Sequence, residues 1–343
     1  MSLLKRVAPF IIISLLYGCA GKKLPDIVWP LPPDPPKIRF VKSFAGSGQF
    51  KGLNVSDIFL GIEPVGGAFI KPHGVHADQH DRIFVTDTGA GLVIVLDPTK
   101  NKVSMVGASG RTLFAKPIGV TSDKDGNVYV TDSAKDLVFV FDGNDQFVTA
   151  FGREGEFKQP TGLAVDNARG LLYVTDTHKH QIFVLNKKTG EIIKTIGKRG
   201  KLEGEFNFPA YITLDKKGNL YVVDIMNGRM QVFDPEGRFL RTWGRLGDGP
   251  GQFARPKGVA IDSEGHIYVV DAAFNNVQMF NEDGQMLMAF GEYGEGRSQQ
   301  ILPAGIAIDS EDRIYLVDQW NARVNVYEYM GEKYKARQGK KNP

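Results

Sequence analysis

The chain has little cysteine, little histidine and almost no excess of charge. Its 343 residues include one cysteine and six histidines. A single cysteine excludes an internal disulfide, and no Cys-x-x-Cys-His segment is present to attach haem covalently. Lysine and arginine number 42 against 39 acidic residues. The formal net charge of +3 offers no electrostatic case for a nucleic acid as partner.

The N-terminal apolar run is too short to span a membrane. Residues 7–16 follow two basic residues and have the length of a signal-peptide core. The segment that comes next, Leu16-Tyr17-Gly18-Cys19, resembles a bacterial lipobox. We therefore predict a lipoprotein signal peptide over residues 1–18 and a lipid anchor on Cys19.

A lipid anchor would determine where the protein works. Several acyl chains on Cys19 hold a protein stably at a membrane, whereas one chain does not. We predict the bacterial cell envelope as the location, with membrane contact through the lipid anchor only. Ala20 stands where aspartate usually retains a lipoprotein in the inner membrane. We therefore expect the outer membrane if the cell is Gram-negative.

Composition divides the rest of the chain into three parts. Residues 19–37 hold the lipid-anchored cysteine and a proline-rich stretch, which we predict to be an extended polyproline II tether. Residues 38–330 form one domain, because a single repeat runs through them. Residues 331–343 are charged, and we predict a frayed C-terminal tail.

One sequence pattern recurs six times in that domain. It reads Pro-x-Gly, an apolar alternation ending in Asp, a turn, Tyr-Val-x-Asp, and a further alternation. The second aspartates, 44 to 48 residues apart, are Asp87, Asp132, Asp176, Asp224, Asp271 and Asp318. A fixed period of about 40 to 50 residues built from short strands is typical of a propeller. We predict an all-β fold, a six-bladed β-propeller.

Each repeat holds four period-2 runs, which predict a four-stranded antiparallel blade. The first five repeats end on an apolar residue followed by glycine, as at Phe290-Gly291, and the sixth has no such ending. Residues 40–44 align instead with the last strand of the fourth repeat. We predict that this N-terminal strand completes the sixth blade and closes the ring, because closure removes an open sheet edge.

The pairing of Pro-x-Gly-Val-x-x-Asp with Tyr-Val-x-Asp resembles the NHL repeat, a family of six-bladed propellers. The resemblance covers residues 38–330. Neither the Gly-His and Trp-Asp pair of WD40 repeats nor the double glycine of kelch repeats recurs. With the lipobox, the chain resembles bacterial NHL-repeat lipoproteins. This resemblance implies a binding platform, but the fold also hosts enzymes, so the function has to be argued from the sites.

The repeated aspartates favour a structural role over carboxylate chemistry or calcium binding. One set ends the first strand and opens a turn, and the other ends the second strand and tethers the next loop. Six equivalent copies of each cannot form one active site.

Histidine tests for metal chemistry. The amidating lyases resemble NHL propellers and bind metal through histidines at the x of Pro-x-Gly; the streptogramin lyases also work with metal near the channel. Here the x positions are His73, Ile118, Thr161, Ala210, Lys257 and Ala304. One histidine cannot make a three-histidine zinc site. We expect no metal site, no cofactor and no catalytic residue, and we interpret His178 and His180 as part of a solvated loop.

One rim carries the candidate binding residues. Met226, Phe274 and Trp320 lie two or three residues beyond the second aspartates, where large apolar side chains mark a binding patch or pack on a neighbouring loop. Both interpretations stay open. The loops between blades add arginines to the same rim, among them Arg245 and Arg255.

The mouth of the central channel lies beneath this rim, and there we expect His73, Thr161 and Lys257. Three hypotheses follow. The first is a non-catalytic platform, a monomer, that binds an unidentified envelope protein or peptide. The second is a metal-dependent lyase or hydrolase around His73, which the absence of further channel histidines disfavours. The third is binding of envelope carbohydrate through the rim aromatics.

Overall fold

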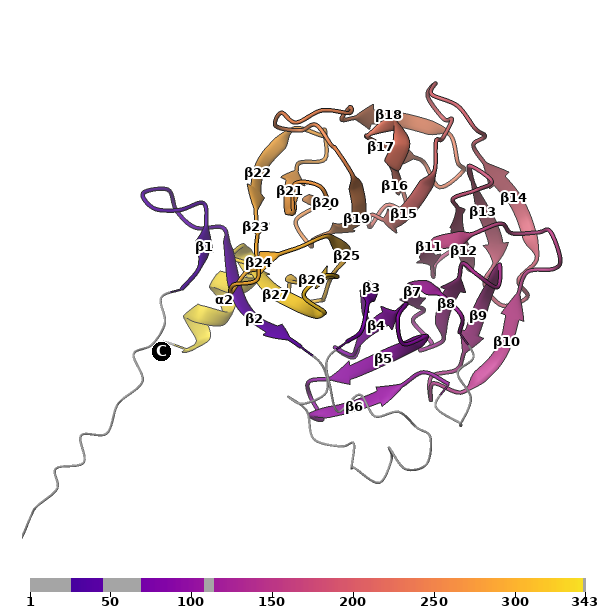
Figure 1. Cartoon of the computed structure of the whole chain (residues 1–343), viewed down its shortest axis with the longest axis horizontal. Helices are drawn as coiled ribbons and strands as arrows, with labels where there is room; N and C mark the ends of the chain where they lie inside the picture. Colours follow the sequence, from indigo (N-terminus) through magenta and orange to yellow (C-terminus); the bar gives the residue numbers. More distant parts are fainter. Residues whose placement is uncertain (1–25, 46–68, 108–113, 342–343) are drawn as a thin grey trace, which may run out of the picture.

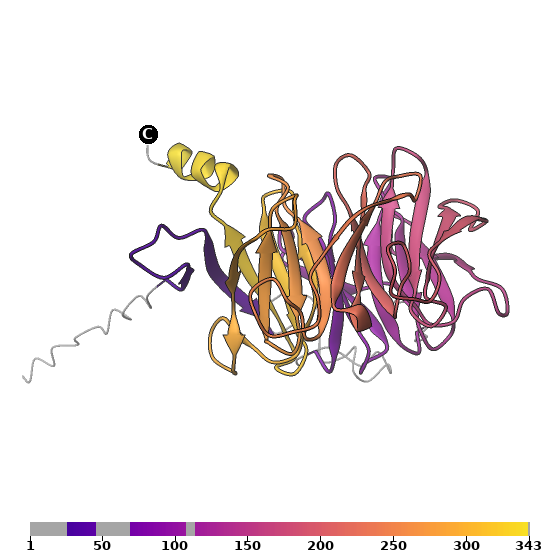
Figure 2. The same cartoon turned by 90° about the horizontal axis from the view of Figure 1, so that it is seen from above.

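The computed structural model describes residues 26–45, 69–107 and 114–341. Six antiparallel sheets stand around a central axis and follow one another in sequence order around the ring (Figure 1). Seen from above, the blades form one thick disc (Figure 2). The six-bladed all-β propeller predicted from the repeats is confirmed.

The first three blades are complete four-stranded meanders. Their strands are β3 (Pro72–Ala77), β4 (Ile83–Asp87), β5 (Leu92–Asp97) and β6 (Lys102–Met105) in blade one; β7 (Pro117–Ser122), β8 (Val128–Asp132), β9 (Leu137–Phe141) and β10 (Phe147–Phe151) in blade two; and β11 (Pro160–Asp166), β12 (Leu171–Asp176), β13 (Gln181–Asn186) and β14 (Ile192–Ile196) in blade three.

Blades four and five follow the same plan. Their elements are β15 (Pro209–Leu214), β16 (Leu220–Asp224), the short 3-10 helix η2 (Ile225–Asn227), β17 (Arg229–Phe233) and β18 (Phe239–Trp243) in blade four; and β19 (Pro256–Ile261), β20 (Ile267–Asp271), β21 (Asn276–Phe280) and β22 (Met286–Phe290) in blade five. Before blade six, β23 (Glu292–Tyr293) and β24 (Gln299–Gln300) form a small parallel pair.

The sixth blade combines both ends of the domain. It consists of β25 (Pro303–Ile308), β26 (Arg313–Asp318) and β27 (Arg323–Tyr329), with β2 (Ile38–Phe44) as the outer strand. Strand β2 is antiparallel to β27, with Phe44 opposite Val324 and Ile38 opposite Tyr329. The two strands lie side by side in Figure 1, indigo next to yellow. The predicted closure of the ring by the N-terminal strand is confirmed.

The hydrophobic core is divided among the spaces between blades. Six clusters of buried apolar residues lie between successive blades around the ring, including the space between blades six and one. Each blade therefore buries both faces against its neighbours, as expected for a sheet that cannot be stable alone.

Part of the predicted tether belongs to the propeller instead. Strand β1 (Val28–Trp29) pairs with β2, and the N–H of Lys37 donates to the carbonyl of Trp29 at 2.7 Å. The Trp29 ring packs 5.8 Å from Tyr327 and 6.0 Å from Phe290. The expectation of an extended spacer is therefore wrong for residues 27–37, because burial of an indole outweighs the polyproline preference. Cys19 and the signal segment lie outside the described residues.

The C-terminal segment is a helix and not a frayed tail. Helix α2 (Glu332–Lys341) projects from one face of the disc (Figure 2). Arg337 forms ion pairs with Glu328 and Glu311, both at 2.5 Å, and the N–H of Glu332 donates to the side chain of Glu264. These contacts fix the charged segment on blades five and six, whereas its composition had indicated a segment without fixed contacts. No helix in the described ranges is long and apolar enough to cross a membrane.

Candidate binding site at the channel mouth

An irregularity in the innermost strand of every blade shapes the channel. In blade one Pro72 pairs with Asp87, and regular pairing resumes only at Val75 with Val85. The same interruption follows the corresponding proline of each other blade. Such irregularities re-aim side chains. Here the interruption falls on the x and Gly of Pro-x-Gly, at the end of the strand where the second aspartate stands.

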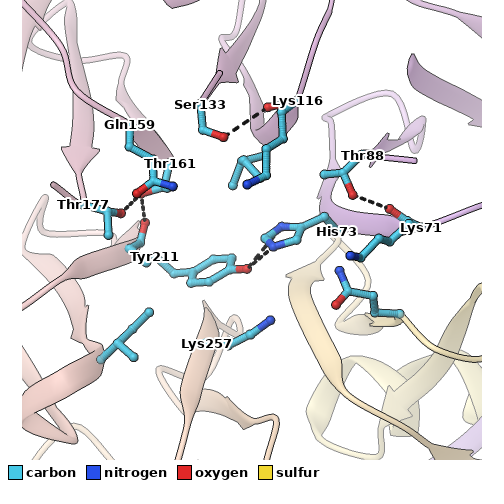
Figure 3. A pocket seen from close by; sticks show the side chains of 14 residues that line it. Lys71, His73, Thr88, Lys116, Ser133, Gln159, Thr161, Thr177, Tyr211 and Lys257 are labelled. Atoms are coloured by element: carbon cyan, nitrogen blue, oxygen red, sulfur yellow. Dashed lines mark hydrogen bonds between the residues drawn. The ribbon is translucent and has the colours of Figure 1, made fainter. Parts of the chain in front are cut away.

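The side chains at this end surround a cavity of about 280 Å³, which we name the channel mouth. All six blades contribute to its lining. The predicted residues His73, Thr161 and Lys257 line it together, as Figure 3 shows, and they come from blades one, three and five. The three residues that the sequence analysis assigned to the channel mouth therefore lie around one cavity.

His73 and Tyr211 face each other across the mouth. Their rings are nearly parallel, at 8°, and the hydroxyl oxygen Oη of Tyr211 lies 3.3 Å from Nδ1 of His73 (Figure 3). Burial and, after it, the positive charges of Lys257, Lys116 and Lys71 lower the pKa of His73 to about 3. The imidazole is therefore neutral at physiological pH and a weak base.

Two further side chains of the mouth have pKa values moved by burial. Burial lowers the pKa of Lys257 to about 8, with the charges of Arg255 and Lys71 acting in the same direction. Burial also raises the pKa of Tyr211, whose hydroxyl stays protonated. The site therefore combines a neutral imidazole, a phenol and a lysine that titrates near physiological pH.

The hydroxyl groups of the mouth residues Thr161 and Thr177 bond to each other and to backbone carbonyls. Oγ1 of Thr161 lies 2.9 Å from Oγ1 of Thr177, and Thr177 donates to the carbonyl of Pro209 at 2.8 Å. Thr161 is therefore held by the protein, which makes the ammonium group of Lys257 the more available donor.

Lys71, Lys116 and Tyr211 are among the mouth residues that sequence reasoning missed. The two lysines come directly before the repeat prolines of blades one and two. Tyr211 stands where the other five repeats have the glycine of Pro-x-Gly. That break in the repeat was a visible signal for a special residue.

Another histidine lies deeper in the channel, although only the x positions were expected to place histidines there. His76 and Ser122 belong to a second cavity of about 280 Å³ lined by the middle residues of the innermost strands. Nε2 of His76 lies 2.8 Å from the hydroxyl of Ser122 and accepts a hydrogen bond from its N–H. Burial lowers the pKa of His76 to about 4, so this imidazole is also neutral.

The loop that carries His178 and His180 was expected to be solvated, but it is partly buried. His180 is buried, its Nδ1 accepts a hydrogen bond from the N–H of Phe208, and its ring packs 4.7 Å from the Phe208 ring. His178 is exposed. Within the described residues, no three histidine, cysteine or acidic side chains are grouped so as to hold a metal ion.

The repeated aspartates have the structural role predicted for them. Asp87 accepts hydrogen bonds from four backbone N–H groups, two directly before β3 and two in the loop after β4. Asp78, at the end of the first strand, accepts two in the turn that follows. The remaining repeats show the same use of one or both oxygens, as at Asp132 and Asp262.

The predicted rim residues differ in exposure. Trp320 is 68% exposed and Met226 is 55% exposed, whereas Phe274 is half-buried. Arg245 and Arg255 are both exposed. Of the two interpretations left open, packing fits Phe274, and a solvent-facing patch fits Trp320 and Met226.

Trp320 lines a groove next to the channel mouth. This rim groove has a volume of about 490 Å³, and its wall includes Trp320, Ile70, Leu302 and Arg255. It shares Lys257 with the channel mouth, so the two hollows adjoin. An exposed indole, two aliphatic side chains and a guanidinium thus lie around one hollow.

Six four-stranded antiparallel blades around a lined axial mouth define a β-propeller of the NHL type. The family described as 6-bladed beta-propeller matches residues 156–230, 216–275 and 263–339, and the NHL repeat family matches residues 114–141. The chain belongs to the 6-bladed beta-propeller family.

Individual relatives share parts of the chain or its fold. A segment of 87 residues is 33% identical to a probable peptidyl-alpha-hydroxyglycine alpha-amidating lyase of Caenorhabditis elegans and covers 24% of this chain. That segment spans only 25% of the lyase, and a match to chicken NHL repeat-containing protein 2 spans 13% of that protein.

Two solved structures illustrate the similarity in fold. An auxiliary nutrient binding protein from Bacteroides thetaiotaomicron has a TM-score of 0.62 at 15% identity, over 77% of this chain and 70% of that chain. A streptogramin B lyase has a TM-score of 0.57 at 14% identity, over 76% and 94%. At these identities the similarity concerns the fold alone.

Proposed function

We propose that this propeller is a lipid-anchored, non-catalytic binding platform for a protein or peptide in the bacterial cell envelope. The observation that carries the proposal is the exposure of Trp320, 68%, beside the rim groove with Arg255. Tryptophan and arginine are the residue types that most often dominate binding energy at interfaces. An indole buries a large area when a partner covers it, which repays its unfavourable exposure in the free protein.

A comparison of matched surface variants tests the platform. Partners are captured from solubilised envelopes with wild-type protein, Trp320→Ala and Leu287→Ala. Leu287 is 44% exposed on the outer strand β22, away from the rim, so it controls for loss of any apolar surface residue. We expect Trp320→Ala to weaken binding by roughly 1–3 kcal/mol while its melting temperature stays near wild type. Equal capture by all three proteins would contradict the rim as the interface.

Membrane fractionation tests the anchor. We expect Cys19→Ser to leave the membrane fraction or to keep its signal segment, because the thiol is the acceptor of the lipid in a lipobox. Fractionation and the mass of the mature N-terminus measure this directly. Normal processing and membrane partitioning of the variant would exclude a lipid anchor.

A lyase is the second candidate, favoured by the pairing of His73 with Tyr211 and by the segment similar to an amidating lyase. The low pKa of His73 makes it a poor general base at neutral pH. Metal analysis of purified protein, with turnover of a peptidyl-α-hydroxyglycine compared between wild type and His73→Ala, separates the candidates. Stoichiometric metal and turnover that His73→Ala abolishes would establish the lyase.

A further inference from the structure

Four basic side chains converge at one end of the channel, and the described residues place no acidic partner beside them. Lys71, Lys116 and Lys257 line the channel mouth, and Arg255 lies beside Lys257 in the rim groove. The buried Lys187, by contrast, has its ammonium 2.7 Å from an aspartate oxygen. Within the described ranges, none of the four converging side chains forms an ion pair, although many other basic groups do.

The acidic groups of the same region are committed elsewhere. Among the described residues, neither the channel mouth nor the rim groove has an aspartate or glutamate in its wall. Asp87, at the end of β4, is fully buried and uses its oxygens to accept backbone N–H groups, including that of Lys71. Within the described part of the chain, no carboxylate therefore lies in contact with the charged ends of these four side chains.

The ionisable groups in the mouth respond to this excess of positive charge. After burial, the causes that lower the pKa of Lys257 are the charges of Arg255 and Lys71. Those that lower the pKa of His73 are the charges of Lys257, Lys116 and Lys71. A bound anion would offset this repulsion, and partial burial would strengthen its attraction to the lysines.

A neutral donor completes the site. The hydroxyl of Tyr211 points into the same space as His73 and Lys257 in Figure 3, and Lys116 approaches from the opposite side. Ile118 and Ala210 add apolar wall around these groups. A volume of about 280 Å³ accommodates a small acid or a chain end and excludes a folded domain.

We propose that the channel mouth binds a carboxylate group, with Lys257, Lys71 and Lys116 as its charge partners and the Tyr211 hydroxyl as an additional donor. The carboxylate belongs either to a small dicarboxylic acid or to the C-terminus of a peptide. This site goes beyond the rim interface proposed above, because it requires no contact with Trp320 and can be tested without the protein partner.

Calorimetry with defined probes distinguishes the two sources. The probes are succinate, tetraglycine with a free C-terminus, tetraglycine amide and inorganic phosphate, titrated into the whole domain. We expect the free acids to bind and the amide to bind at least tenfold more weakly. Tighter binding of succinate than of tetraglycine assigns a small acid, and the reverse order assigns a peptide terminus. Phosphate binding as tight as that of the better acid would overturn the choice of carboxylate.

Charge-removing variants locate the site. Lys257→Met should weaken binding roughly tenfold to a hundredfold, because a hydrogen bond to a charged group is lost. Lys71→Met, at an exposed position, should weaken it by about tenfold and provides a second variant if Lys257→Met folds poorly. Lys217→Met is the control, because Lys217 pairs with Glu282 in the turns at the opposite end of the strands.

The pH dependence adds a readout that a structural role would not change. Lys257 has a pKa of about 8 in the free protein, and it faces the cations Arg255, Lys71 and Lys116 and the neutral side chains of His73 and Tyr211. Its protonated form binds the anion, so affinity should fall as pH rises through 8. Binding at pH 8 should also take up protons, seen as a buffer-dependent heat. Lys257→Met should lose both effects.

Two results would overturn the proposal. One is that neither acid binds the wild-type domain more tightly than tetraglycine amide does. The other is that Lys257→Met and Lys71→Met, with melting temperatures near wild type, bind the acids as the wild type does.

Discussion

The first three blades and the last three blades share one strand plan but use different buried polar groups to hold it. In blades one to three the residue before the second aspartate is a buried threonine: Thr86, Thr131 and Thr175. Each hydroxyl accepts from the glycine N–H of its own Pro-x-Gly and donates to a carbonyl of the next blade. In blades four to six the corresponding residues are Val223, Val270 and Val317.

The third strands show the opposite distribution. Their central residues are Ile94, Phe139 and Phe183 in the first half and Gln231, Gln278 and Asn325 in the second. The buried amide of Gln278 accepts from the N–H of Gly251 and donates to the carbonyl of Gln252, in the loop that enters its blade. Gln231 holds the preceding loop in the same way.

The difference shows that the repeat determines the arrangement of the strands. The buried polar groups that stabilise this arrangement differ between the two halves. The loops entering blades four, five and six run 11 residues from the glycine after the outer strand to the next proline, against 7 for the loop entering blade three. A longer loop has more backbone groups to satisfy. The amides of the second half supply these partners, whereas the threonines of the first half join the inner strands directly.

We expect the largest loss of stability when blade six loses β2, the strand that it takes from the N-terminal end of the domain. Deleting residues 26–44 removes the outer strand of blade six and the buried side chains of Ile38, Phe40 and Phe44. At ~1.5–3 kcal/mol for each buried apolar side chain, the loss is roughly 5 kcal/mol or more, comparable with the stability of a whole domain. Melting and hydrogen exchange should show blade six losing protection before blades two and three.

A chain that begins at residue 26 is the control for this deletion and should melt like the full chain. If the chain without residues 26–44 and the chain that begins at residue 26 melt at the same temperature, β2 does not stabilise the closed ring.

An exchange of core residues between the halves should have the next largest effect. Phe139→Gln places an amide in the apolar cluster between blades one and two and should cost roughly 3 kcal/mol or more. Gln278→Leu leaves the N–H of Gly251 and the carbonyl of Gln252 without their partner and should cost about 1–3 kcal/mol. Urea denaturation measures both.

The exposed Gln285 in the same blade supplies the control, and Gln285→Leu should change stability by less than about 0.5 kcal/mol. Equal stability of all three variants would show that the amides do not distinguish the halves.

The glycine of Pro-x-Gly should contribute to stability equally in both halves of the propeller. A Cβ on Gly162 or on Gly258 would lie within 3.0 Å of a carbonyl oxygen of the next blade. Gly162→Ala and Gly258→Ala should therefore each cost about 1–3 kcal/mol through overpacking. Gly143, where a Cβ would meet nothing closer than 3.6 Å, is the control. Tolerance of alanine at Gly258 but not at Gly162 would mean that close packing belongs to the threonine half only.

The smallest expected effects concern the threonine links. Thr131→Val removes a hydroxyl that bonds Gly119 and the carbonyl of Thr161 and should cost roughly 1 kcal/mol. Val270→Thr should be nearly neutral, because Gly258 keeps blade five as close to blade six as the threonine link requires. Differential scanning calorimetry compares the two. A loss above ~2 kcal/mol in Val270→Thr would show that the second half cannot accept the link.

The sequence determined the number of blades, their strands and the closing strand, as residues 40–44 show. These features depend on local periodicity and turn chemistry, which are readable one repeat at a time. It also placed His73, Thr161 and Lys257 at one end of the channel, because equivalent positions of a repeat lie at the same level of a ring. The lipobox at Cys19 remains a prediction.

Only the tertiary structure decided what those positions meet. Trp29 packs on blade six and Arg337 anchors a terminal helix, because partners distant in sequence offered buried area and charge. The convergence of Lys71 and Lys116 on Lys257 arises in the same way. These residues lie in different repeats, and the closed ring brings their like charges to one mouth.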